Sequence, residues 1–300
     1  MSVSIIIPFY MGEKYFTGLK KNLEKVCLKS PEDVEVILVN DSPEEKKDDS
    51  TGPDWDVMKS ETYRLEVIQH EKNSGIHQAR VTGLKAAKGD YILFLDQDDY
   101  IESDFLSVMC KALQEKKDAA YCFANGTFDE GDRKKIILNS YGKVEAAQKY
   151  ESYVYVGNLL SSPGQCLIRK DAIPQVWKTD IMMSNCSDDL LLWILLLRSG
   201  RAEFVNRMLY RHRDSGSNLS ADEKAGFVSD MEVCEILKRN KALPAKLQKF
   251  MEKRCRMHLY PEKYGIVAKK SMRFQESARR GMMRIKGIAY ALAGRRINKT

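Results

Sequence analysis

YILFLDQDDY, residues 91–100, leads from an uncharged apolar stretch directly into three aspartates. Such a continuous apolar run is typical of a strand that is covered on both faces of a parallel sheet. Two similar runs rich in Ile and Val lie at 4–8 and 34–39, and a more mixed one lies at 65–69. Together these four segments predict four strands of one sheet.

Helical segments separate and follow the predicted strands. Apolar residues recur at helical spacing in 15–28 and 103–113, and Ser103 is placed to cap the second of these helices. A third helix is predicted at 76–88, because Gly89 follows it in the position that often ends a helix. This alternation of strand and helix predicts an α/β fold with a doubly wound sheet.

Polar side chains follow the strands at the points where they end. Tyr10 comes after the first strand, Asp41 after the second, and Asp96, Asp98 and Asp99 after the fourth. Ligands of such sheets bind beyond the carboxyl ends of the strands, so these residues are expected to line one crevice. Carboxylates this close together repel one another unless a cation joins them, and hard oxygen ligands suit Mg²⁺ or Mn²⁺. The alternative is a solvated acidic loop without a ligand.

The remainder of the chain differs from the first part. Residues 116–225 are rich in turns but contain a strongly apolar predicted helix at 188–199, and residues 226–300 are predicted to be helices with a basic face. Residues 231–300 hold 19 Lys and Arg against 5 Asp and Glu, whereas the preceding part holds 30 against 37. We therefore divide the chain at 1–115, 116–225 and 226–300.

Composition excludes several classes of protein. With 43% hydrophobic and 30% charged residues, the chain is neither disordered nor fibrous. No apolar run reaches the ~18 residues of a bilayer span, and no secretory signal is evident. Seven cysteines without a C-x-x-C pair favour a reducing, cytoplasmic location, with the inner face of the membrane as the alternative. The basic charge comes without a nucleic-acid-binding motif, so no nucleic acid partner is expected.

Four stretches of the chain together resemble the inverting glycosyltransferases of family 2, which have the GT-A fold. These stretches are IIPFYMGEKY (6–15), VILVNDSPEE (36–45), NSGIHQARVTGLKAAKGDYILFLDQDD (73–99) and, more loosely, SDDLLLWILL (187–196). The resemblance implies a doubly wound mixed sheet with a helical C-terminal extension. It also implies that a hexosyl group moves from a nucleotide sugar, expected to be a UDP-sugar, to a glycan, lipid-linked or glycoprotein acceptor.

The resemblance assigns roles to the residues at the strand ends. Tyr10 would offer an aromatic face to the base, and Asp41 would accept a hydrogen bond from the ring N–H of uracil. Asp96 and Asp98 match the DxD motif, which holds the ribose and the metal of the diphosphate, here Mn²⁺ or Mg²⁺. The implied nucleotide-binding residues are Pro8, Tyr10, Asp41, Arg80 and Asp96.

An inverting transfer also needs a base that deprotonates the acceptor hydroxyl. The family places it in a Glu-Asp pair at the start of a helix, and Asp188 and Asp189 occupy that position here. Asp189 is the predicted base and Asp188 its neighbour, although the reverse assignment stays open. His212 is a candidate contact of the diphosphate, and Gln165 and Trp177 are candidate contacts of the acceptor.

Two questions stay open from the sequence: whether the chain is catalytic, and what its basic C-terminal part contacts. The chain could be a catalytically idle module of the same fold that binds a nucleotide sugar or scaffolds a complex. The basic residues 231–300, including the amphipathic segment 271–294, are expected to act away from the chemistry. They would contact either a membrane surface or another subunit of a homo-oligomer.

Overall fold

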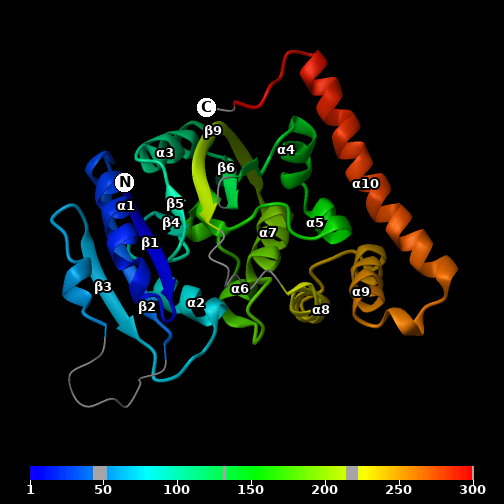
Figure 1. The fold of residues 1–300 in the computed structure, drawn as a ribbon, viewed down its shortest axis with the longest axis horizontal. Helices are drawn as coiled ribbons and strands as arrows, with labels where there is room; N and C mark the ends of the chain where they lie inside the picture. Colours follow the sequence, from blue (N-terminus) through cyan, green and yellow to red (C-terminus); the bar gives the residue numbers. More distant parts are fainter. Residues whose placement is uncertain (43–52, 131–132, 214–221, 299–300) are drawn as a thin grey trace.

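The computed structural model describes residues 1–42, 53–130, 133–213 and 222–298. The end of the quoted stretch 36–45, from residue 43 onward, lies outside the described residues. One mixed sheet crosses the molecule, helices cover both of its faces, and further helices follow at the C-terminal side (Figure 1). The expected α/β architecture is therefore confirmed.

The sheet runs in the order β3-β2-β1-β4-β8-β6-β9-β5, and β7 pairs with β6. Its strands are β1 (Ser2–Phe9), β2 (Asp33–Asn40), β3 (Arg64–Gln69), β4 (Tyr91–Phe94), β5 (Tyr100–Ile101), β6 (Ala119–Glu130), β7 (Arg133–Ile136), β8 (Cys166–Arg169) and β9 (Arg201–Arg213). The first four are parallel to one another, β8 is antiparallel to β4 and β6, and β6 is parallel to β9. The sheet is thus mixed, as expected.

Helices pack on both faces of this sheet. The helices are α1 (Phe16–Leu28), α2 (Ile76–Ala86), α3 (Phe105–Glu115), α4 (Tyr141–Ala147), α5 (Tyr150–Val156), α6 (Gln175–Thr179), α7 (Asp188–Ser199), α8 (Glu223–Arg239), α9 (Ala245–Leu259) and α10 (Ile266–Leu292). Alternate residues of β1 enter different cores: Ile5 and Ile7 pack with α1 and α3, whereas Ile6 packs with α2 and α7. Burial on both faces explains why the central strands read as continuous apolar runs.

The middle of the chain is more regular than its sequence indicates. The predicted helix 188–199 is present as α7, but the remainder of 116–225 also supplies four strands. The longest of these, β6 and β9, form a parallel ladder that is interrupted by register shifts, so their pairing is not uniform. Ser103 does not cap α3, because Asp104 occupies the N-cap position and the hydroxyl of Ser103 accepts from Lys29 instead.

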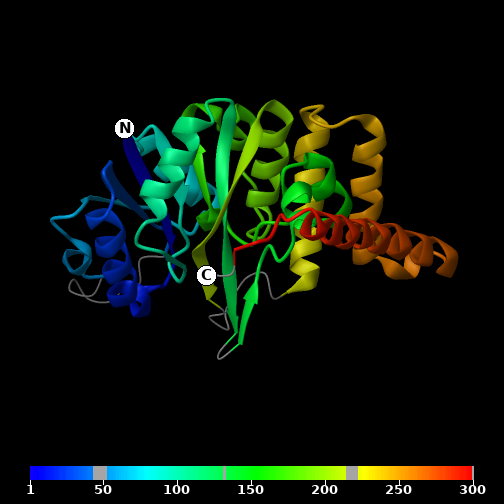
Figure 2. The same cartoon turned by 90° about the horizontal axis from the view of Figure 1, so that it is seen from above.

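The C-terminal helices divide into two groups. Val233 and Leu237 of α8 and Met251 and Cys255 of α9 are buried in the same core cluster as α7. Residues of α8 and α9 are therefore part of the core, and removing them would expose it; that the chemistry lies outside residues 231–300 stays a prediction. By contrast, α10 runs along the outer edge of the molecule in Figure 1, and in Figure 2 its N-terminal part projects beyond α9. Among the described residues, no helix has both the length and the apolar content to cross a bilayer.

Candidate active site

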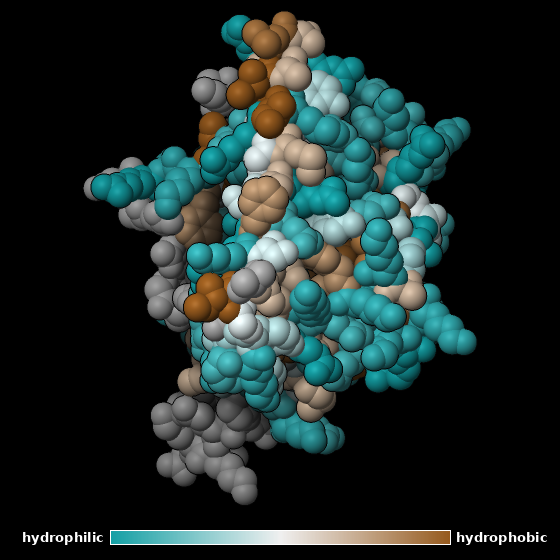
Figure 3. Space-filling model, turned by 90° about the vertical axis from the view of Figure 1, so that its right-hand side faces the viewer, coloured by the Kyte–Doolittle hydropathy of each residue, from teal (hydrophilic) through white to brown (hydrophobic). Residues whose placement is uncertain are grey.

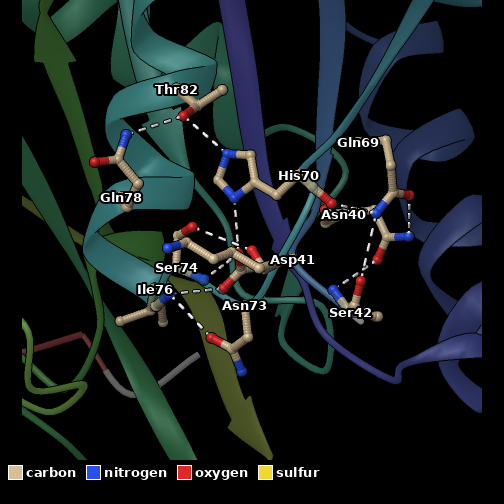
Figure 4. A network of polar contacts seen from close by, with 12 residues as sticks. Asn40, Asp41, Ser42, Gln69, His70, Asn73, Ser74, Ile76, Gln78 and Thr82 are labelled. Carbon is tan, nitrogen blue, oxygen red and sulfur yellow. Dashed lines mark hydrogen bonds and ion pairs between the residues drawn. The ribbon is translucent and has the colours of Figure 1, made fainter. Parts of the chain in front are cut away.

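Asp41 forms the centre of a polar network beyond the end of β2 (Figure 4). Its Oδ1 accepts from the backbone N–H of Ser74 at 2.8 Å and from Nδ1 of His70 at 2.7 Å, and its Oδ2 accepts from the N–H of Gly75 at 2.8 Å. The other ring nitrogen of His70 lies 2.9 Å from the hydroxyl of Thr82 on α2. A carboxylate has about four acceptor positions, so about one remains for a ligand.

This network fixes the start of α2. Gly75 has φ 86°, and a Cβ added there would lie 2.6 Å from Oδ1 of Asn185, so a side chain at this position would be strained. The next residue, Ile76, donates its backbone N–H to the same oxygen at 3.2 Å. His77 then contacts the backbone of Trp177 and Met182. The first turn of α2 is therefore bound to the segment that leads into α7.

The DxD turn is anchored by its middle residue. Gln97 accepts from the backbone N–H of Tyr10 at 3.0 Å and donates to the carbonyl of Tyr10 at 3.1 Å, which ties the turn to the end of β1. The Tyr10 side chain is 46% exposed, as a base-stacking surface requires, and Pro8 lies at the same end of β1. Oδ2 of Asp96 accepts from the hydroxyl of Ser162 at 3.0 Å.

Asp99 links this turn to the end of β9. Its buried carboxylate accepts from the hydroxyl of Tyr210, from the backbone N–H of Arg213 at 3.2 Å, and contacts Nδ1 of His212 at 3.1 Å. Burial raises the pKa of Asp99 to about 6. Burial opposes the charge of His212, but the hydrogen bond to Asp99 and the neighbouring aspartates raise its pKa. His212 therefore lies beside the DxD turn, where the sequence predicts a diphosphate contact.

Arg80 joins the two acidic regions of the site. Its Nη1 lies 2.9 and 2.8 Å from the two carboxylate oxygens of Asp188, and its Nη2 lies 2.6 Å from Oδ1 of Asp96. Burial disfavours the charge, but Asp188 and Asp96 raise the pKa of Arg80. Only 3% of Arg80 is exposed, so the predicted direct contact with a nucleotide does not match this placement. Arg80 instead holds Asp96 and Asp188 in place from the interior of the protein.

Asp189 begins α7 next to this bridge but does not bind Arg80. Its Oδ2 accepts from the amide of Asn158 at 2.6 Å, and its Oδ1 accepts from the N–H of Leu190 at 2.7 Å. Burial, together with the negative charge of Asp188, raises the pKa of Asp189 to about 7. A carboxylate with such a pKa is suited to accept a proton near neutral pH.

Carboxylates of the DxD turn have the chemistry to share a divalent cation with a substrate. Among the described residues, no group of three or more His, Cys, Asp or Glu side chains gathers as a metal site. Mg²⁺ and similar ions are, however, commonly held by one or two carboxylates, water and the phosphates of the substrate. The half-buried Asp96 and Asp98 fit such a shared site.

Two predicted acceptor contacts are placed elsewhere. Gln165 is fully buried and bonds the backbone of Ser161 and Ala124, and Trp177 is fully buried against His77. Neither side chain is open to a sugar, so these predictions are corrected: both residues belong to the interior.

Sequence reasoning did not identify Asn158 or Ser162 as site residues. Asn158 bonds Asp189, and Ser162 bonds Asp96 while capping the short turn that Pro163 begins. The Ser-Ser-Pro-Gly signal at 161–164 could have identified the second, because a serine before proline often caps a turn. No local signal distinguishes Asn158, since its partner is 31 residues away.

Comparisons with known proteins identify the family of this chain. The model of the family "Glycosyl transferase family 2" matches residues 4–177. Glycosyltransferase GlyG of Streptococcus pneumoniae is 30% identical over 131 residues, which cover 43% of this chain and 41% of GlyG. The poly(ribitol-phosphate) beta-N-acetylglucosaminyltransferase TarS of Staphylococcus aureus is 38% identical over 111 residues, which cover 35% of this chain and 18% of TarS. The chain thus spans less than half the length of these relatives.

Solved structures show the same fold. TarS 1–349 of S. aureus, in complex with UDP-GlcNAc, has a TM-score of 0.61 at 18% identity, covering 91% of this chain and 79% of the other. Mannosyltransferase PcManGT of Pyrobaculum calidifontis, in complex with GDP-Man and Mn²⁺, has a TM-score of 0.56 at 13% identity, covering 98% and 80%. These likenesses show a GT-A fold. Because the family model spans more than half of its residues, the chain belongs to glycosyl transferase family 2.

Proposed function

We propose that this chain is an inverting glycosyltransferase that moves a sugar from a UDP-sugar to a hydroxyl of a glycan acceptor, either lipid-linked or protein-linked. The observation that carries the proposal is the bridge of Arg80 between Asp96 and Asp188. It joins the predicted donor site to the start of α7. Asp189, with a pKa raised to about 7 by burial and by Asp188, lies next to that bridge.

The proposed reaction is a single displacement. The acceptor oxygen forms a bond to C1 of the sugar while the bond between C1 and the diphosphate oxygen breaks, and the transition state resembles an oxocarbenium ion. The acceptor proton passes to Oδ2 or Oδ1 of Asp189, and the electron pair of the broken bond leaves with the diphosphate. Asp188 is a positioning residue, since its carboxylate is already held by Arg80.

The donor would lie along the carboxyl ends of the strands. Tyr10 is exposed there for stacking on uracil; Asp41 is only 4% exposed, but unlike Arg80 it retains a position with which it would bind the ring N–H. A bound Mn²⁺ or Mg²⁺ would neutralise charge that develops on the departing diphosphate. Asp96 and Asp98 would hold it, and His212, whose pKa is raised by Asp99 despite burial, lies at the same end. TarS in complex with UDP-GlcNAc and PcManGT in complex with GDP-Man and Mn²⁺ share this fold, which supports a nucleotide-sugar donor and a divalent metal here.

Asp189→Asn tests the proposal. The substitution keeps the shape of the side chain but removes the base, so kcat for hydrolysis of UDP-sugars should fall by roughly 10²- to 10⁴-fold. UDP binding, measured by calorimetry, should persist. An active Asp189→Asn variant together with an inactive Asp188→Asn variant would reverse the roles of the two residues. A parent protein that binds UDP but turns over no sugar nucleotide would instead indicate the idle module.

A further inference from the structure

One face of α10 is held firmly against the body of the protein. Gly142 of α4 approaches so closely that a Cβ added there would lie 1.8 Å from the carbonyl oxygen of Met283. Gly287, one turn further on, approaches Ser140 in the same way: a Cβ added to Gly287 would lie 2.7 Å from the Cβ of Ser140. Arg279 stacks on the ring of Tyr155 at 4.1 Å. These close contacts fix the rotation of α10 about its own axis.

The opposite face of α10 carries an apolar stripe. With about 3.6 residues per turn, Phe274, Ile285, Ile288 and Leu292 fall on one line, diametrically across from Met283 and Gly287. Their exposed fractions are 73%, 68%, 62% and 85%. Figure 3, which looks onto this side of the molecule, shows apolar side chains gathered toward the end where α10 finishes. Burial against the body therefore does not explain these residues.

The charge of α10 indicates what covers the stripe. Residues 266–292 contain seven Lys and Arg and a single acid, Glu276. Glu276 contacts His258 of α9 at 3.2 Å, so the acid is turned toward the protein. Arg284 is exposed along one flank of the stripe, and Arg280, one turn before it, is exposed further around the helix. A second copy of this helix would bring arginines without any acidic partner, whereas an anionic surface complements them.

We propose that the outer face of α10 is a docking surface for anionic lipid bilayers. The apolar stripe enters the boundary between headgroups and acyl chains, and the flanking arginines contact lipid phosphates. Since α10 packs on α4 and α5, the glycosyltransferase body is held close to that surface. The proposal does not rest on the proposed chemistry, because none of the residues of the predicted site lies on α10.

Vesicle cosedimentation of the full chain tests the docking surface. Parent protein should bind vesicles of equimolar phosphatidylcholine and phosphatidylglycerol but not vesicles of phosphatidylcholine alone, and binding should weaken as salt is added. Ile285→Asp with Ile288→Asp should abolish binding. Arg280→Gln and Arg284→Gln should each weaken it about fivefold. Leu28→Asp, at a residue of α1 that is 76% exposed, is the matched control and should bind like the parent.

Because these residues are exposed, their substitution is not expected to unfold the protein. Thermal unfolding of each variant should match the parent within experimental error, because surface substitutions of this kind change stability little. Equal binding of the Ile285→Asp, Ile288→Asp variant and the parent would overturn the proposal. A parent dimer by light scattering that this variant converts to a monomer, without vesicle binding by either, would also overturn it and assign the stripe to a second copy.

Discussion

The two acidic regions of the site are held in opposite ways. Asp96, at the end of β4, is half-buried and accepts from both Arg80 and Ser162, and Asp98 follows it on an open turn. Asp188 and Asp189, at the start of α7, are both buried, yet only Asp188 binds a cation. Asp189 receives two amide hydrogen bonds in place of a countercharge.

Under the proposed function, this difference separates a metal site at the strand end from a proton acceptor at the start of α7. At the strand end, the half-buried carboxylates of Asp96 and Asp98 have the chemistry to share an external cation with a phosphate. At the helix start, burial and a like-charged neighbour make ionisation costly, which raises the pKa of Asp189 to about 7. Because Arg80 contacts both Asp96 and Asp188, its positive charge determines how far each of these two carboxylates is neutralised. The comparison therefore depends first on Arg80.

Arg80→Met should produce the largest effect. It leaves Asp188 buried without its cation, and breaking a buried pair in this way costs about 3–5 kcal/mol. The free energy of unfolding, measured with denaturant, should fall by that amount, and turnover should be lost. Arg64→Met is the control, since Arg64 pairs with Asp33 at the surface, where such pairs contribute about 0–1 kcal/mol. Equal losses in the two variants would show that the bridge contributes no special stability.

Asp98→Ala should affect the strand end alone. If Asp98 holds the metal, UDP affinity in the presence of Mn²⁺ should fall by at least about tenfold, the loss found even for outer partners of a metal. EDTA should lower the affinity of the parent by a similar factor and have little further effect on the variant. Asp118→Ala, at an exposed pair with Arg201, is the matched control. Calorimetry that shows no change with either EDTA or Asp98→Ala would remove the metal from the mechanism.

Both acidic regions could be located from sequence, because each follows a strong local signal. Continuous apolar runs predict the strands that end near Asp41 and Asp96, and an apolar helix begins at Asp188. The contacts that tune these residues could not be located, since Arg80 and Asp188 are 108 residues apart. A helical arginine is ordinarily expected at the surface. The β6–β9 ladder leaves little local signal for a related reason: β9 carries charged residues throughout and pairs with β6 and β5, which are both distant in sequence.

The difference in pH dependence between the parent and Asp189→Asn should report on the helix start, because Asp99, whose pKa is also raised, is present in both proteins. With a pKa of about 7, Asp189 is the base only when ionised, so kcat/KM should fall about tenfold per pH unit well below 7. A raised carboxyl pKa means that the folded state binds the extra proton, so stability should fall as pH rises from about 4 to about 7. Asp189→Asn should therefore gain stability relative to the parent across that window. Parallel stability profiles of the two proteins would contradict the raised pKa.

Ser187→Ala should have the smallest effect, because Ser187 affects the start of α7 indirectly, through the α8 residue that its hydroxyl binds. The hydroxyl of Ser187 donates to Oδ1 of Asp230 at 2.8 Å, and the other oxygen of Asp230 accepts from Arg254 at 2.9 Å. Loss of the hydroxyl leaves that buried ion pair in place, so the cost should be about 1 kcal/mol, the usual contribution of one hydrogen bond.

Ser199→Ala is the matched control for this substitution, at the other end of the same helix. The hydroxyl of Ser199 bonds only carbonyls of its own helix, at Leu195 and Leu196. If α8 and α9 position the start of α7, Ser187→Ala should lower kcat several-fold while Ser199→Ala does not, at comparable stability. Unchanged kcat in both variants would confine α8 and α9 to a structural role. The proton-accepting position would then depend on the groups that hold Asp188 and Asp189 directly, which are Arg80, Asn158 and the backbone N–H of Leu190.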